Sequence, residues 1–178
     1  MQYIVLLRGI NVGGRILKMD ELISCFEKNG YKDVITILQT GNVIINTTKK
    51  DTGKLTNEIE SMLSKTFDYP AKVIVITPDQ LKSMLDKIPF KKDENFHRYL
   101  VFTKDSFEKE LVKNAPDLDP VEEKIMEGAG VVYWTVRKGS TLDSSFGKYL
   151  AKTTSKHFST SRNANTLEKM FAKTETKK

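Results

Sequence analysis

Apolar residues follow one another without interruption in several short segments of the chain, among them residues 3–7 and residues 73–76. Successive residues of a strand face opposite sides of a sheet. An unbroken apolar run therefore predicts a strand that is buried on both faces. We expect helices of the chain to cover one face of this sheet. The other face would be covered by the second half of the chain or by another copy of it.

Between these two strands the hydrophobic spacing changes to that of helices and a hairpin. Residues 19–26 carry apolar side chains at i, i+3, i+4 and i+7, which predicts a helix, and residues 55–63 predict a second one. Residues 34–45 are rich in β-branched residues around a tight turn at Thr40-Gly41, which predicts a β-hairpin. The order strand, helix, strand, strand, helix, strand is that of a ferredoxin-like fold.

The same order returns, more weakly, in the second half of the chain. A terminal helix follows, in which Asn165 and Glu168 have the spacing of a capping box. We therefore predict an α+β fold of two ferredoxin-like (βαββαβ) halves packed together, plus a C-terminal helix. The expected segments are a first half at residues 1–77, a short helix and linker at 78–96, a second half at 97–161, and the C-terminal helix and tail at 162–178.

The charge balance changes this picture little. The chain has 178 residues and a net charge of +6, which invites a nucleic-acid interpretation. The lysines are interleaved with Asp and Glu, however, which favours a solvated surface over a face that follows phosphates. RNA-binding versions of the fold stack bases on aromatic residues of the two central strands. Here Tyr3 stands alone on the first strand, and residues 43–45 include no aromatic residue. We expect nucleic acid to be an unlikely partner.

Several classes of protein are disfavoured by what the sequence lacks. Its single cysteine, Cys25, allows no internal disulfide, so we expect a reducing cytoplasmic location. No apolar run reaches the roughly 18 residues of a membrane span. The two histidines, His97 and His157, lie far apart, and no spacing indicates a metal site, a cofactor or a catalytic nucleophile. The sequence assigns no catalytic residue and leaves enzymatic activity open.

Two polar segments, residues 8–18 and 39–42, are expected at one edge of the first sheet. In a ferredoxin-like order the loop after the first strand and the hairpin turn lie at the same end of the strands. Arg8 offers a planar fork of donors that suits a carboxylate or a phosphate. The glycines permit exposed backbone N–H groups, and the loop leads into a helix N-terminus, which favours anions. We expect a small anionic or polar ligand here, although neither a Walker loop nor a dinucleotide fingerprint is present.

Three motifs in these regions carry a resemblance to a known family. They are RGINVGG at residues 8–14, LQTGNV at residues 38–43 and SRNANT at residues 161–166. Together with Lys18-Met19 they resemble the bacterial family called domain of unknown function 1697. The resemblance extends over nearly the whole chain. It implies cytoplasmic α+β proteins built from ferredoxin-like halves, and it implies no activity.

The third motif adds residues to the expected site. The family usually has Trp or another bulky residue where this chain has Ala164, so the resemblance implies that one packing contact is absent here. Helix capping by Asn165 and Thr166 is the structural alternative for this segment. The expected ligand-binding residues are Arg8, Asn11, Gly13, Gly14, Arg15, Lys18, Gln39, Gly41, Asn42, Arg162 and Asn163.

Three interpretations stay open at this point. The motifs bind a small anionic or polar ligand, or they are structural and join the two halves or two copies of the chain, or the basic surface binds nucleic acid without specificity. The protein is expected to be a monomer or a homodimer.

Overall fold

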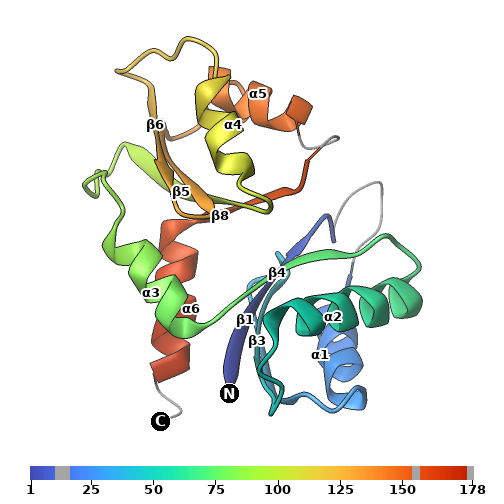
Figure 1. The fold of residues 1–178 in the computed structure, drawn as a ribbon. Helices are drawn as coiled ribbons and strands as arrows, with labels where there is room; N and C mark the ends of the chain where they lie inside the picture. The colour runs from blue at the N-terminus through green and yellow to red at the C-terminus, as the bar shows by residue number, and fades with distance from the viewer. Residues whose placement is uncertain (11–16, 154–156, 176–178) are drawn as a thin grey trace. The chain divides into compact units, whose positions relative to one another are not determined.

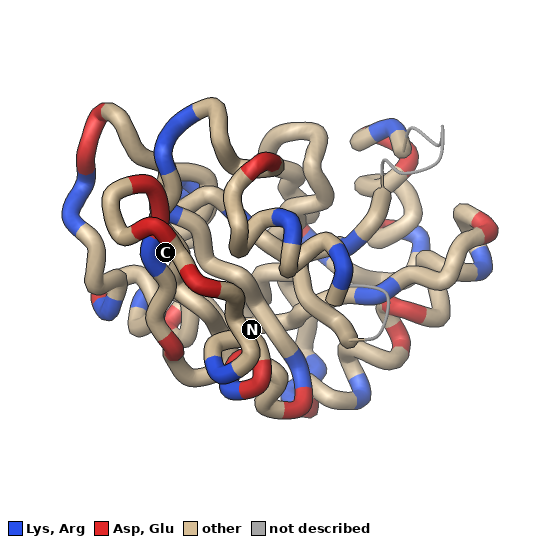
Figure 2. The backbone as a smooth tube through the Cα atoms, turned by 90° about the horizontal axis from the view of Figure 1, so that it is seen from above, with Lys and Arg blue, Asp and Glu red and all other residues tan. Residues whose placement is uncertain are grey.

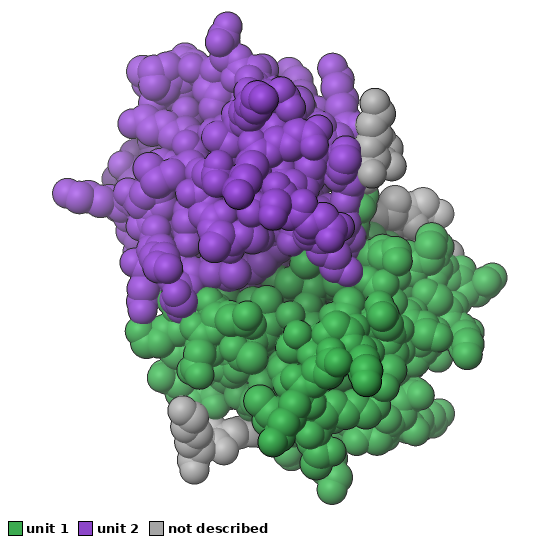
Figure 3. Space-filling model, in the orientation of Figure 1, with its two compact units in different colours: residues 1–82, 169–178 green, residues 83–168 purple. Residues whose placement is uncertain are grey.

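The structure is a computed structural model that describes residues 1–10, 17–153 and 157–175 (Figure 1). The expected α+β class is confirmed, because each half of the chain contains a four-stranded antiparallel sheet with helices. The chain divides into two compact units, which Figure 3 distinguishes by colour. The first unit comprises residues 1–82 and the C-terminal residues from 169 onward, and the second comprises residues 83–168.

The first unit has the strand order β2-β3-β1-β4 of a ferredoxin-like sheet. The predicted hairpin is present, since β2 and β3 are antiparallel neighbours joined by a four-residue turn at residues 38–41. Its elements are β1 (Gln2–Arg8), α1 (Met19–Lys28), β2 (Lys32–Ile37), β3 (Asn42–Asn46), α2 (Thr52–Phe67) and β4 (Lys72–Ile76), followed by α3 (Pro78–Asp86), which continues into the second unit.

Strand β1 is buried on both faces, as its unbroken apolar run predicts. Tyr3 and Val5 pack in one core cluster with side chains of α1 and α2, the two helices that cover this face in Figure 1. Ile4 and Leu6, which alternate with them, are fully buried on the opposite face. Fully burying one such side chain contributes about 1.5–3 kcal/mol, so this strand is a main source of stability for the unit.

The second unit repeats the arrangement with the strand order β6-β7-β5-β8. Its core forms around the central strands, where Val101, Trp134 and Phe146 are buried in one cluster. The elements are β5 (Phe96–Thr103), α4 (Phe107–Lys113), β6 (Glu123–Gly128), β7 (Val131–Arg137), α5 (Ser145–Thr153), β8 (Ser159–Asn163) and α6 (Ala164–Glu175), whose last residues belong to the first unit.

Two buried carboxylates form hydrogen bonds that connect helices to this second sheet. Glu123 accepts a hydrogen bond from Trp134 Nε1 at 3.2 Å and from the backbone N–H of Phe146 at 3.1 Å, which caps the start of α5. Glu108 accepts from Thr103 Oγ1 at 2.7 Å. Burial by itself raises the pKa of Glu108, but this bond and bonds from backbone N–H groups outweigh it, so the pKa lies below its usual value.

The capping box expected in the C-terminal helix is wrong. Helix α6 begins at Ala164, and Oδ1 of Asn163 accepts the backbone N–H of Asn165 at 2.9 Å, so Asn163 is the capping residue. Glu168 does not reach back to the cap. Its carboxylate pairs with Lys92 at 2.8 Å and with Arg98 at 3.0 Å. The cap falls on Asn163 because β8 leads directly into the helix without a linker.

Charged residues of both signs are interspersed along the backbone of the described residues (Figure 2). Several form ion pairs across neighbouring elements, such as Lys72 with Glu60 at 3.0 Å and Arg137 with Glu122 at 2.7 Å. None of the helices in the described ranges is both long enough and apolar enough to cross a bilayer.

Candidate functional site

The hairpin turn lies directly against the end of β1, as the strand order predicts. The backbone N–H of Leu7 donates to the carbonyl oxygen of Gly41 at 2.8 Å. Gly41 has a φ of +71°, and a Cβ atom there would lie 2.8 Å from Leu7 Cβ and 3.1 Å from Ile10 Cδ1. Glycine is therefore needed both for the backbone conformation and for the close approach. The turn therefore lies beside the end of β1 and beside Ile10, the last described residue before the gap at 11–16.

Asn42 holds this turn together from inside. Its side chain is fully buried, and Nδ2 donates to the carbonyl oxygen of Ile37 at 2.9 Å and to Thr40 Oγ1 at 2.8 Å. One amide therefore ties the end of β2 to the tip of the turn, at the position where β3 begins. A buried amide with two such bonds fixes the geometry of the residues between its acceptors.

The residues enclosed by these bonds form an exposed and strained tip. Leu38 has a φ of +58° and is 56% exposed, although a leucine in the left-handed region costs roughly 1–2 kcal/mol. Gln39 and Thr40 follow it and are exposed as well. Strained backbone persists only where its surroundings enforce it, and such positions cluster at binding and catalytic sites. The turn thus presents two polar side chains on a fixed frame.

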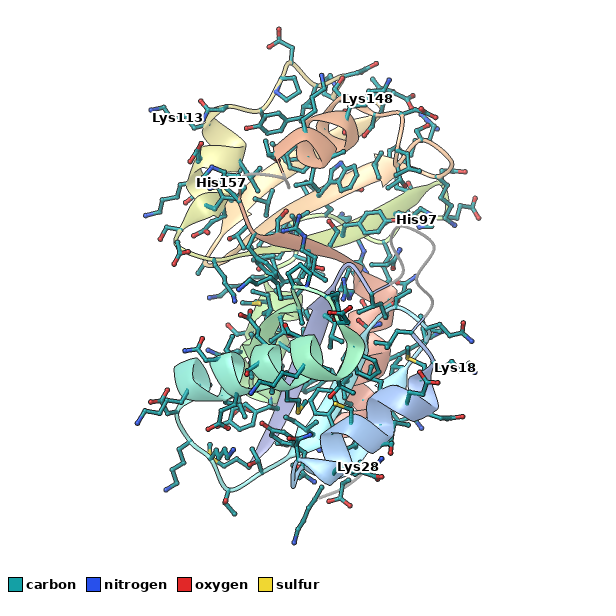
Figure 4. All side chains as sticks on the ribbon, turned by 90° about the vertical axis from the view of Figure 1, so that its right-hand side faces the viewer. Lys18, Lys28, His97, Lys113, Lys148 and His157 are labelled. Atoms are coloured by element: carbon teal, nitrogen blue, oxygen red, sulfur yellow. The ribbon has the colours of Figure 1, made fainter. Side chains whose placement is uncertain are left out.

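The cations expected at this edge have different surroundings. Arg8 is half-buried at the end of β1, opposite Lys72 of β4 in the sheet register. Lys18 is exposed immediately before α1, and its Nζ lies 4.0 Å from a carboxylate oxygen of Glu21. Both side chains of that pair are more than half exposed, so the pair contributes at most about 1 kcal/mol. Figure 4 shows Lys18 at one end of α1 and Lys28 at the other.

Four of the expected site residues, Asn11, Gly13, Gly14 and Arg15, lie outside the described residues. The structure therefore places Arg8, Gln39, Gly41 and Asn42 at this edge of the first unit, and Lys18 immediately before α1.

Arg162 and Asn163 belong to the second unit. Arg162 is only 9% exposed, and Nη1 donates to Thr160 Oγ1 at 2.8 Å and to the carbonyl oxygen of Ser161 at 2.9 Å. Burial of the guanidinium lowers the pKa of Arg162 to about 10. Asn163 caps α6, a role that sequence reasoning assigned to its neighbour Asn165. An asparagine placed one residue before an apolar helical repeat is the signal that identifies it.

Three further residues bear on the chemistry that the chain supports. Tyr3 is fully buried and donates its hydroxyl to the carbonyl oxygen of Lys49 at 3.0 Å, so its ring does not stack on a base. Cys25 is buried between α1 and α2, 3.4 Å from Thr66 Oγ1. Among the described residues, no three His, Cys, Asp or Glu side chains lie close enough together to hold a metal ion.

The fold and the motifs define the class to which this protein belongs, that of α+β proteins with two ferredoxin-like units. The profile of a family described as "Protein of unknown function (DUF1697)" matches residues 1–133, so the chain belongs to this family. Membership of the family that the motifs resemble is thereby confirmed; the match includes the first two motifs and ends before the third, at residues 161–166.

One solved structure similar to the chain is that of the conserved bacterial protein SP0830 from Streptococcus pneumoniae. The two are 21% identical in sequence and superpose with a TM-score of 0.77 over 96% of this chain and 97% of that one. At this identity the likeness shows a shared fold. No curated protein matches the chain.

Proposed function

We propose that the first unit binds a small anionic or polar ligand at its hairpin edge, which we define as Arg8, Lys18, Gln39 and Thr40. The observation that supports this most is the contact between the turn and the end of β1, where the Leu7 N–H bond to Gly41 holds the second motif against the strand that leads into the first. A site needs side chains whose positions are fixed before the ligand arrives. The tight turn supplies such a support for Gln39 and Thr40.

The chemistry of the hairpin edge suits a small ligand better than a long polyanion. Arg8 carries a planar fork of donors, Lys18 carries a point charge, and the Gln39 amide both donates and accepts. The first turn of α1 carries Asp20 and Glu21, which repel a ligand that extends far along the helix. One carboxylate or phosphate group with a neutral polar portion fits this set of charges. The proposal is one of binding and assigns no reaction.

A structural role is favoured for three of the expected ligand-binding residues. Gly41 is needed for the close approach of the turn, Asn42 ties the turn together, and Asn163 caps α6. Under the proposal Gly41 and Asn42 support the hairpin edge without touching the ligand.

A thermal-shift screen with phosphorylated metabolites, nucleotides and small carboxylates tests the proposal. A ligand at 100 times its dissociation constant adds about 2.7 kcal/mol to the free energy of unfolding. We expect at least one compound to raise the melting temperature, and Gln39→Ala and Lys18→Ala to abolish that increase. Lys28→Ala is the matched control, because it removes an exposed lysine from the opposite end of the same helix (Figure 4).

The proposal fails if no compound in a broad library raises the melting temperature. It also fails if the increase is the same in Gln39→Ala and Lys18→Ala as in the unaltered protein.

A further inference from the structure

A cavity of about 320 Å³ lies at one end of the second sheet, within the second unit. It is lined by the linker before β5, by the first residues of β5, by Lys138 just after β7 and by Asn165 in the first turn of α6. The backbone of Lys138 donates to the carbonyl oxygen of Asn95 at 2.9 Å, which closes one wall. The Arg137 guanidinium covers the ring of Phe96 at 5.1 Å. Small-molecule sites have volumes of about 300–1,000 Å³, so the cavity has room for one small ligand.

The hydrogen-bond network assigns the proton of His97, which lines this cavity. Oδ1 of Asn163 accepts the backbone N–H of Asn165, so the amide orientation of Asn163 is fixed. Its Nδ2 therefore points to His97 Nδ1, at 3.4 Å, as a donor. Because Nδ1 accepts, the neutral imidazole carries its proton on Nε2. Nε2–H has no hydrogen-bond partner among the described residues.

Three charged groups in the wall already have partners. Arg98 donates from Nη2 to Glu168 at 3.0 Å and from Nη1 to the carbonyl oxygen of Phe90 at 3.3 Å. Lys92 pairs with the same carboxylate of Glu168 at 2.8 Å. Asp93 accepts the backbone N–H of Asn95 at 2.7 Å. These groups shape the cavity and leave little charge for a ligand to neutralise.

Two lining groups of opposite charge have no partner in the described part of the chain. Neither the ammonium of Lys138 nor the carboxylate of Glu94 forms a hydrogen bond or ion pair with another described residue, although both line the same cavity. With His97 Nε2–H, the cavity offers two donors that suit a carboxylate and one acceptor that suits an ammonium. A dianion such as phosphate would lie beside Glu94 with only one unpaired cation to offset its charge.

We propose that this cavity binds a small zwitterion of the amino-acid class. Its carboxylate accepts from His97 Nε2–H and from Lys138, and its ammonium donates to Glu94. Asn163 acts as a positioning residue, because it caps α6 and sets the tautomer of His97 through the two ends of one amide. The site lies in the second unit and is independent of the hairpin edge.

Nuclear magnetic resonance on the full chain tests this proposal. The protein, labelled with ¹⁵N, is titrated with each of the twenty standard amino acids while the ring nitrogens of His97 and the amide of Lys138 are followed. We expect at least one amino acid to give saturable shifts of both. Its N-acetyl derivative lacks the ammonium, and its amide derivative lacks the carboxylate. Each should bind at least tenfold more weakly, as expected for the loss of one charge-assisted contact.

Single substitutions locate the site. His97→Ala, Lys138→Ala and Glu94→Gln should each weaken binding about tenfold or more, and the last two affect exposed side chains, so they test the site even if His97→Ala fails to fold. His157→Ala and Lys148→Ala are matched controls that remove the other histidine and a lysine of α5 (Figure 4). Three results would overturn the proposal: no saturable shift with any amino acid, equal binding of the N-acetyl form, or equal binding of inorganic phosphate.

Discussion

Replacing Asn42 with alanine tests whether the hairpin divides into a supporting frame and an exposed tip. The substitution removes the donor to the Ile37 carbonyl oxygen and the donor to Thr40 Oγ1. An acceptor left without a partner in the half-buried end of β2 costs about 1–3 kcal/mol. Thr40 is exposed, so its hydroxyl can bond to water instead. Losing the hydrogen bond to Thr40 therefore adds little to the destabilisation. We expect the free energy of unfolding to fall by about 2 kcal/mol, which is roughly 4–8 °C in melting temperature.

The assay for Asn42→Ala is urea denaturation followed by circular dichroism, together with a thermal melt. Gln39→Ala is the control, because it changes an exposed side chain of the same turn and should alter the free energy of unfolding by less than about 0.5 kcal/mol. Asn42→Asp should destabilise the protein as well, since a carboxylate cannot donate to Ile37. If Asn42→Ala is as stable as Gln39→Ala, the assignment of Asn42 to the frame is refuted.

Three further predictions test the local geometry. Gly41→Ala should lower the free energy of unfolding by about 2–4 kcal/mol, and Gly30→Ala by only about 1–2 kcal/mol. Both glycines have a positive φ, but only Gly41 lacks space for a Cβ atom. Chemical denaturation measures both losses. Asn163→Ala should lower the free energy of unfolding by about 1 kcal/mol, and Asn163→Asp by much less, because aspartate keeps the oxygen that caps α6. Equal losses in the two variants would contradict the capping role of Asn163. Thr103→Val should lower the free energy of unfolding more at pH 7 than below the lowered pKa of Glu108, because a hydrogen bond to a carboxylate is stronger than one to a neutral carboxyl. Denaturation across pH measures this difference.

The fold follows closely from the local pattern of the sequence. The unbroken apolar run of β1 predicts burial on both faces, and Ile4 and Leu6 confirm it. The position of the hairpin beside the first loop follows from the strand order alone, because β2 and β3 must reverse at the end where β1 finishes. Such inferences succeed because they depend only on the two-residue period of a strand and on antiparallel pairing.

The roles of particular polar side chains depend on partners that are distant in sequence or on backbone angles that no pattern reveals. The sequence predicts Asn42 as a ligand-binding residue, and only the structure shows that it is buried, in a turn where Leu38 adopts a left-handed conformation. The burial of Arg162 beside Thr160 depends on the pairing of β8 with β5, which no local pattern of the sequence shows. The capping box failed for a similar reason, because two cations of distant segments attract Glu168.

The proposed function makes its sharpest prediction at the tip of the hairpin. Take the compound that raises the melting temperature most, and titrate it into ¹⁵N-labelled protein while following the backbone amides of Gln39, Thr40 and Arg8. We expect saturable shifts at these amides, and we expect Gln39→Ala to abolish them while its fold and stability stay intact. Saturable shifts confined to other parts of the chain, or unchanged shifts in Gln39→Ala, would contradict it.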